Sequence, residues 1–420
     1  MFDGWGRFKH PTAMKLDIEF VRSQFPAFAE PVLQGQAFFE NAGGSYTCGA
    51  VIDRLTRFYT QRKVQPYAPY AASTLGGEEM DEARSRMAAI LGVDTDELSF
   101  GPSTTQNTYV LAQAFGQMMQ PGEAIIVTNQ DHEANTGPWR RLAERGIEVR
   151  EWAIDPETGH LDPADLEKLL DDKVRLVCFP HCSNVVGEIN PVTEITALAH
   201  SAGAFVCVDG VSYAPHGFVD VGALGPDIYL FSAYKTYGPH QGLMVIRRML
   251  AELLPNQGHY FNADTLYKRF TPAGPDHAQV AACAGMADYV DALYAHHGGG
   301  DADAAARGVA VHDLMRGHET ALLQQVLDAV KDRNSVRLIG PQEAGQRAPT
   351  VALALNRAGL DVARDLAEKG IMTGGGDFYA VRALKAMGVD VEKGVLRLSF
   401  THYTSQAEID QLLNALDDVL

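Results

Sequence analysis

The 420-residue sequence is poor in cysteine, with five residues, an odd number, and no C-x-x-C pair. This argues against a disulfide framework and against a structural zinc site. No apolar run reaches the roughly 18 residues that a membrane helix needs. Charges are spread through the first twenty residues, unlike a signal peptide. We therefore expect a cytoplasmic protein with no membrane partner.

Basic residues are also scarce, since 35 Lys and Arg stand against 53 Asp and Glu, a net charge of −18. A nucleic-acid partner is disfavoured, because phosphate contacts need clustered Lys and Arg. The fourteen histidines show no H-E-x-x-H spacing, so no metal site is expected. Nor is there a G-x-S-x-G elbow of a serine hydrolase.

Hydrophobic residues make up 46% of the chain, enough for a sizeable core in two or three domains. From Leu98 to Arg248, short apolar runs alternate with helical patterns, which predicts an α/β domain with a mostly parallel sheet flanked by helices. The predicted strands are Ala124–Thr128, Val149–Ile154, Val174–Phe179, Phe205–Asp209, Ile228–Phe231 and Leu243–Arg247.

A different pattern follows Tyr294, where His297 and three glycines predict a surface connection. Strands at 351–355 and 396–400 and a closing helix from Ser405 then indicate a smaller α+β domain. We predict a segment 1–37 that lacks a sheet partner and packs on the small domain, a large domain 38–295 and a small domain 296–420.

Polar residues directly follow the predicted strands of the large domain. Ligands in open α/β sheets bind beyond the carboxyl ends of the strands, so we expect these side chains to meet there. They are His132 and Asn135, His181 and Asn184, Asp209 and Ser212, and Ser232, Tyr234 and Lys235.

This set suits pyridoxal 5′-phosphate (PLP), which needs a Schiff-base lysine, an acid at its ring nitrogen and a planar group on its ring. It also needs a donor to the ring hydroxyl and a helix N-terminus for its phosphate. Lys235, Asp209, His132, Asn184 and residues 103–105 would supply these in turn.

Six segments in order resemble the class V aminotransferases of PLP fold type I, in the cysteine desulfurase-like branch. They are residues 38–44 (FFENAGG), 132–139 (HEANTGPW), 183–187 (SNVVG), 208–216 (VDGVSYAPH), 232–242 (SAYKTYGPHQG) and 397–403 (RLSFTHY). The resemblance implies a seven-stranded-type sheet, a homodimer and a small amino acid as substrate.

The resemblance also implies residue roles. The catalytic residues would be Lys235, Asp209 and His132. Arg397 would grip the substrate carboxylate, although it could instead pair with an internal Glu, and Asn41 and Tyr379 would also touch the substrate. The remaining cofactor-binding residues would be Thr104, Thr105, Asn184, Ser212, Ser232 and Tyr234.

One departure bears on the reaction. Tyr379 stands where desulfurases carry a nucleophilic cysteine, which disfavours a persulfide route through that loop. We therefore expect an aminotransferase or a β-eliminating C–S lyase. A cysteine desulfurase with another sulfur acceptor, or a catalytically silent binding protein, stays open. Tyr46 and His240 are unranked candidates for choosing among reactions, and Cys182 is expected to be inert.

Overall fold

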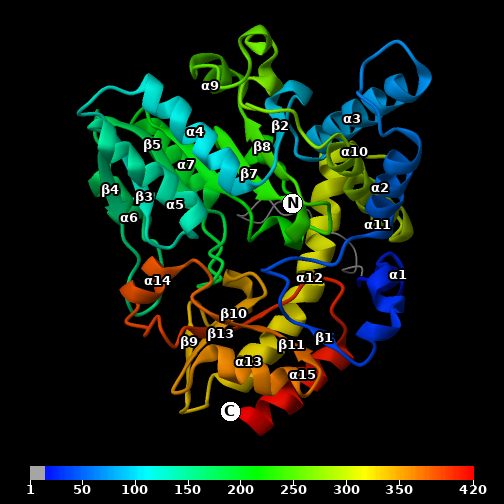
Figure 1. The fold of residues 1–420 in the computed structure, drawn as a ribbon. Helices are drawn as coiled ribbons and strands as arrows, with labels where there is room; N and C mark the ends of the chain where they lie inside the picture. The colour runs from blue at the N-terminus through cyan, green and yellow to red at the C-terminus, as the bar shows by residue number, and fades with distance from the viewer. Residues whose placement is uncertain (1–14) are drawn as a thin grey trace, which may run out of the picture.

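The computed structural model describes residues 15–420 and shows a large domain above a smaller one (Figure 1). The large domain has a seven-stranded sheet of order β2-β8-β7-β6-β5-β3-β4, in which β8 runs opposite to the other six strands. The strands are β2 (Leu98–Gly101), β3 (Ala124–Thr128), β4 (Glu148–Trp152), β5 (Val174–Pro180), β6 (Phe205–Asp209), β7 (Ile228–Ser232) and β8 (Gly242–Ile246). The predicted fold class and the six predicted strands are confirmed, and β2 was missed.

The sheet is buried on both faces. Ala124 and Ile126 of β3 belong to one apolar cluster, whereas Ile125 and Val127 belong to a second cluster with Trp139. Successive side chains of a strand point to opposite faces, so both faces are covered. This explains why the strands read as unbroken apolar runs.

Helices cover this sheet, and their capping residues set where they begin. Asp162 accepts a hydrogen bond from the Ala164 N–H at the start of α6, and Ser103 accepts one from the Gln106 N–H at the start of α4. The helices are α2 (Gly49–Gln61), α3 (Ala71–Ile90), α4 (Thr104–Met118), α5 (Glu133–Arg140), α6 (Pro163–Leu169), α7 (Val192–Ser201), α8 (Val221–Leu224), α9 (Arg248–Leu253), α10 (His277–Ala282) and α11 (Ala284–His296).

The small domain has a four-stranded antiparallel sheet of order β12-β13-β10-β9. Its closing helix begins after Ser405, as predicted, where Ser405 and Glu408 form a capping box. The elements are β9 (Val336–Ile339), β10 (Thr350–Leu355), α13 (Gly359–Ala367), β12 (Gly374–Gly376), α14 (Val381–Ala386), β13 (Val395–Ser399) and α15 (Gln406–Val419).

A long helix, α12 (Ala304–Val330), passes from one domain to the other (Figure 1). Val311 and Met315 pack in the core of the large domain, while Leu323 and Val326 pack in the core of the small domain. The predicted connection at residues 297–300 lies between α11 and α12 and is confirmed. Within residues 15–420, no helix is long and apolar enough to cross a membrane.

The described part of the N-terminal segment contacts both domains. Arg22 of α1 (Ile18–Ser23) pairs with Glu408 at 2.6 Å, and Asp17 pairs with His296 of α11 at 2.9 Å. Strand β1 (Ala37–Phe38) runs parallel to β11 (Ile371–Met372), so the expectation that this stretch lacks a sheet partner was wrong at its end. Residues 1–14 of the predicted segment lie outside the described residues, and the three-part division stays a prediction.

Candidate active site

A cavity of about 650 Å³ lies where the carboxyl ends of the parallel strands meet the small domain. The loops after β3, β5, β6 and β7 contribute to its wall, together with β13 and the loop before α14. Among the predicted site residues, it brings together Thr104, Thr105, His132, Asn184, Asp209, Ser212, Ser232, Tyr234, Lys235, Tyr379 and Arg397.

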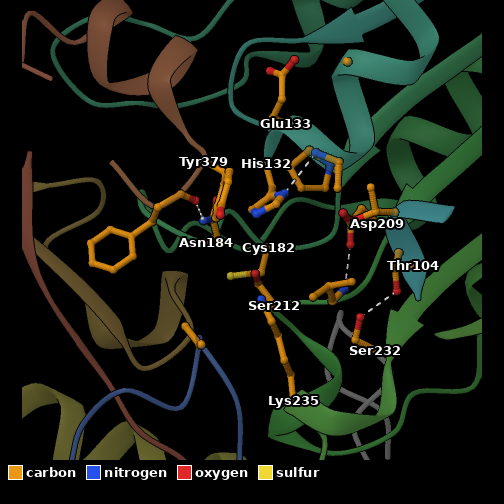
Figure 2. A pocket seen from close by; sticks show the side chains of 18 of the residues that line it. Thr104, His132, Glu133, Cys182, Asn184, Asp209, Ser212, Ser232, Lys235 and Tyr379 are labelled. Carbon is orange, nitrogen blue, oxygen red and sulfur yellow. Dashed lines mark hydrogen bonds between the residues drawn. The ribbon is translucent and has the colours of Figure 1, made fainter. Parts of the chain in front are cut away.

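Lys235 ends a short 3₁₀ turn (Ala233–Lys235) directly after β7, and its side chain enters the cavity (Figure 2). Burial and the nearby Arg397 lower the pKa of Lys235 to about 8, against the opposing effects of Asp209 and Glu40. An amine with this pKa is partly neutral near physiological pH and can act as a base or a nucleophile.

Asp209 is the last residue of β6 and is only 6% exposed. Its Oδ1 accepts a hydrogen bond of 2.8 Å from the Val211 N–H. Burial raises the pKa of Asp209 to about 6, while this hydrogen bond and Lys235 act in the opposite direction. Asp209 is therefore a carboxylate of the cavity that a cationic partner would stabilise.

His132 caps α5 and presents a flat ring to the cavity (Figure 2). Its Nδ1 accepts a hydrogen bond of 3.0 Å from the Ala134 N–H, so the neutral ring carries its hydrogen on Nε2. Burial, Lys235 and Arg397 lower the pKa of His132 to about 3. The ring is therefore neutral at physiological pH.

The N-terminus of α4 forms one end of the cavity. Thr104 Oγ1 and Ser232 Oγ share a hydrogen bond of 2.8 Å across this end (Figure 2). A Cβ added at Gly242 would lie 2.5 Å from the backbone carbon of Ser103, so only glycine lets β8 approach this helix end. The need for Gly242 was missed in the sequence.

Arg397 projects from β13 into the cavity and is only 3% exposed. Its Nη2 donates to Glu40 Oε1 at 2.7 Å, and its Nη1 donates to the Asn184 carbonyl at 3.3 Å. The guanidinium carbon lies 3.8 Å from the centre of the Phe378 ring. Arg397 thus pairs with an internal Glu, the alternative that the sequence left open. Glu40 itself was missed, although it lies in the FFENAGG segment.

A loop of the small domain folds over the cavity. The carbonyl oxygen of Phe378 accepts from Asn184 Nδ2 at 2.9 Å, and that of Tyr379 accepts from the Glu133 N–H at 2.8 Å. Phe378 and Tyr379 have φ angles of 51° and 57°, in the left-handed region of the backbone that residues other than glycine seldom adopt. The Tyr379 side chain is 71% exposed, and its ring centre lies 5.3 Å from that of His132.

Five candidate residues are absent from the cavity wall formed by the described residues: Asn41, Tyr46, Asn135, His181 and His240. Asn41 is buried, and its Oδ1 accepts a hydrogen bond from the Tyr403 hydroxyl. Tyr46 stacks on Phe38 with ring centres 4.6 Å apart, and His240 stacks on Tyr234 at 4.7 Å. Among residues 15–420, His, Cys, Asp and Glu form no group of three that could hold a metal ion.

Comparison with known proteins identifies the family of this chain. The model of the aminotransferase class-V family matches residues 37–293 and 306–412. The chain belongs to the class-V aminotransferase family. It is 33% identical to the aminotransferase-like protein FGM3 of Gibberella zeae, over 97% of this chain and 100% of that protein. It is 32% identical to a cysteine desulfurase of Serratia proteamaculans, over 97% of this chain and 99% of that protein.

Solved structures agree with this family assignment. The apo cysteine desulfurase from Thermococcus onnurineus NA1 is 23% identical, with a TM-score of 0.83 over 97% of this chain and 99% of that one, which shows the fold. The cysteine desulfurase CsdA from Escherichia coli is 25% identical, with a TM-score of 0.79 over 96% of this chain and 98% of that one. The predicted family is therefore confirmed, and this class-V chain is an enzyme of a PLP-dependent family whose members act on small amino acids.

Proposed function

We propose that the cavity binds PLP through Lys235 and that the protein acts on a small amino acid as an aminotransferase or a β-eliminating C–S lyase. The observation that carries this proposal is the meeting of Lys235 and Asp209 in one buried cavity under His132. These groups come from three different strand ends. Lys235 would bond to the aldehyde of PLP, Asp209 would pair with its ring nitrogen, and His132 would lie on the face of its ring.

Unsatisfied polar groups fit the same cofactor. Asn184 Oδ1 is buried and has no hydrogen-bond partner among the described residues. Its Nδ2 uses one hydrogen on Phe378 and has a second one for a ring oxygen. Thr104, Thr105 and Ser232 surround the open N–H groups of α4, where a phosphate would bind. Ser212 and Tyr234 complete the proposed wall around the cofactor.

When bound, PLP supplies an electron sink for bonds broken at the substrate's Cα. Asp209 would hold a proton at the ring nitrogen, since an ionised carboxylate stabilises a cationic partner. Lys235 Nζ, with its pKa near 8, can take the Cα proton at physiological pH. Arg397 would orient the substrate through its carboxylate, and the neutral His132 would cover the ring.

The cysteines of the chain support the reaction type. All five are buried, and burial raises the pKa of Cys48 and Cys182 to about 12. A thiol that takes up sulfur needs exposure and a low pKa. The most exposed cavity residue of the covering loop is instead Tyr379. We therefore favour reactions that leave no sulfur on this chain.

Cysteine desulfuration is the second candidate, because relatives with that name match nearly the whole chain. In that case the sulfur acceptor would be a molecule other than this chain. We further propose a homodimer in the cytoplasm that acts without nucleic-acid or membrane partners, as the resemblance and the composition predict.

An amino-acid panel with PLP-loaded protein tests the proposal, with products identified by mass. A keto acid formed without release of ammonia indicates transamination, because the amino group then passes to the cofactor, whereas pyruvate, ammonia and sulfide from L-cysteine indicate β-elimination. Either result supports the proposal. Alanine with a persulfide on one of the five cysteines would overturn it, and so would a protein that binds PLP but changes no amino acid.

A further inference from the structure

The guanidinium of Arg397, which we assign to binding of the substrate's carboxylate, already pairs with an internal carboxylate, that of Glu40. Glu40 Oε1 lies 2.7 Å from Arg397 Nη2. The Arg397 side chain is 4% exposed, whereas that of Glu40 is 27% exposed and lines the cavity. Arg397 is therefore held in place by its burial, while the Glu40 side chain reaches the cavity that a substrate would enter.

Glycines on both sides make room for this pair. A Cβ at Gly43 would lie 2.9 Å from Glu40 Oε1, and one at Gly374 would lie 2.8 Å from Glu40 Oε2. Gly374 is also the strand partner of Arg397 in the β12–β13 register. The backbone thus leaves a slot beside Arg397 that the carboxylate of Glu40 fills.

The pair leaves hydrogen-bonding capacity free. Glu40 Oε2 and Arg397 Nε are buried atoms without hydrogen-bond partners within residues 15–420. A buried guanidinium needs a counter-ion, so Glu40 compensates its charge while the substrate is away. When a substrate carboxylate arrives, one guanidinium would face two carboxylates in a desolvated cavity, and like charges there repel each other.

We propose that Glu40 competes with the substrate's carboxylate for Arg397 and so sets how tightly this site binds a carboxylate. The inference rests on the proposed function, because it takes Arg397 as the carboxylate-binding group. Displacing Glu40 weakens the binding of every ligand that is anchored only by a carboxylate. Tight binding of a substrate therefore requires contacts beyond its carboxylate.

Propionate is a suitable probe, since it has the carboxylate but lacks the amine that would react with PLP. Its dissociation constant is measured by isothermal titration calorimetry on PLP-loaded wild type, Glu40→Gln and Glu133→Gln. Glu133 is the matched control, because it also lies at the cavity but pairs with Arg382 at 3.3 Å. We expect Glu40→Gln to bind propionate about tenfold more tightly, and Glu133→Gln to stay within about twofold of wild type.

Unchanged or weaker binding by Glu40→Gln, or no binding by either protein, would overturn the proposal. Equal tightening in Glu133→Gln would also overturn it, since loss of charge alone would then explain the effect. Glu40→Asp is a second variant that keeps the charge but draws it back from Arg397, with an intermediate gain expected. Arg397→Gln separates the two proposals: wild-type binding there would refute the role of Arg397 itself, whatever Glu40 does.

Discussion

At the scale of single residues, burial determines the protonation of the cavity. It lowers the pKa of Lys235 to about 8 and that of His132 to about 3, and it raises the pKa of Asp209 to about 6. At pH 7 the protein therefore offers a neutral imidazole, an ionised carboxylate and an amine that gives up its proton readily. This is the set of states that PLP chemistry requires.

Replacing Lys235 with alanine should remove the covalent link to the cofactor. We expect no borohydride-fixed PLP on the tryptic peptide that contains residue 235, and a loss of kcat between about a hundredfold and ten-thousandfold. Peptide mapping by mass spectrometry is the measurement. Lys268→Ala, which changes a lysine outside the cavity wall, is the control. A fixed adduct that persists in Lys235→Ala would refute the assignment.

The carboxylate of Asp209 should make PLP affinity depend on pH. Because burial raises its pKa to about 6, Asp209 takes up a proton as the pH falls through 6 and loses its attraction for a cationic ring. We expect PLP affinity to fall by about tenfold per pH unit below 6, relative to Asp209→Asn. Titration of the apo protein with PLP between pH 5 and 8 measures this. Parallel pH profiles for the two proteins would contradict the prediction.

At the scale of elements, the loop between β12 and α14 closes the cavity. Two backbone carbonyls tie it to the large domain, through Asn184 and through the Glu133 N–H. Two successive residues in the left-handed region cost of order 1–3 kcal/mol each, so this conformation persists only because its contacts require it. The loop thus places Phe378 on Arg397 and Tyr379 at the mouth of the cavity.

A cysteine at the loop's exposed position should create a sulfur acceptor. We expect Tyr379→Cys, loaded with PLP and given L-cysteine, to form a persulfide on residue 379 while alanine is released, because this thiol is not buried. Wild type should form none on its buried cysteines. Thiol labelling followed by mass spectrometry distinguishes the two proteins. A persulfide on wild-type Cys182 would count against this prediction.

At the scale of the whole molecule, the active site depends on how two domains meet across α12. Glu319, on this helix, is fully buried and accepts a hydrogen bond of 3.0 Å from His216 of the large domain. Arg316 lies 3.4 Å from the same carboxylate. Burial alone would raise the pKa of Glu319, but His216 and Arg316 more than offset it, so the pKa is lowered overall.

Removing this carboxylate should destabilise the protein. We expect Glu319→Ala to lower the free energy of unfolding by about 3–5 kcal/mol, since Arg316 loses its counter-ion and His216 loses its hydrogen-bond partner. A lowered pKa stabilises the fold above the unfolded value of about 4.3, and this contribution is lost as the pH falls below it. Urea unfolding at pH 7 and pH 4 measures both effects. Asp328→Ala removes an exposed acid on α12 and is the control, so its urea midpoint should stay at that of the wild type.

The sequence by itself determined most strands of the large domain and most of the polar side chains of the cavity wall. Unbroken apolar runs predicted the buried strands, the helical pattern from Ser405 predicted α15, and the position of polar residues after strands predicted Lys235, Asp209 and His132 as neighbours. These features are local, because side-chain periodicity and helix capping depend on residues that are close together in the sequence. The ends of parallel strands then meet at one edge in any such sheet.

Only the tertiary structure decided which distant groups touch. Glu40 and Arg397 are 357 residues apart, and their pairing depends on a slot shaped by Gly43, three residues after Glu40, and by Gly374 of β12. The reversal of β8 and the turning of Asn41 toward Tyr403 are likewise results of packing. No local pattern encodes such contacts, because a buried charge takes whichever partner the assembled core brings within hydrogen-bonding distance.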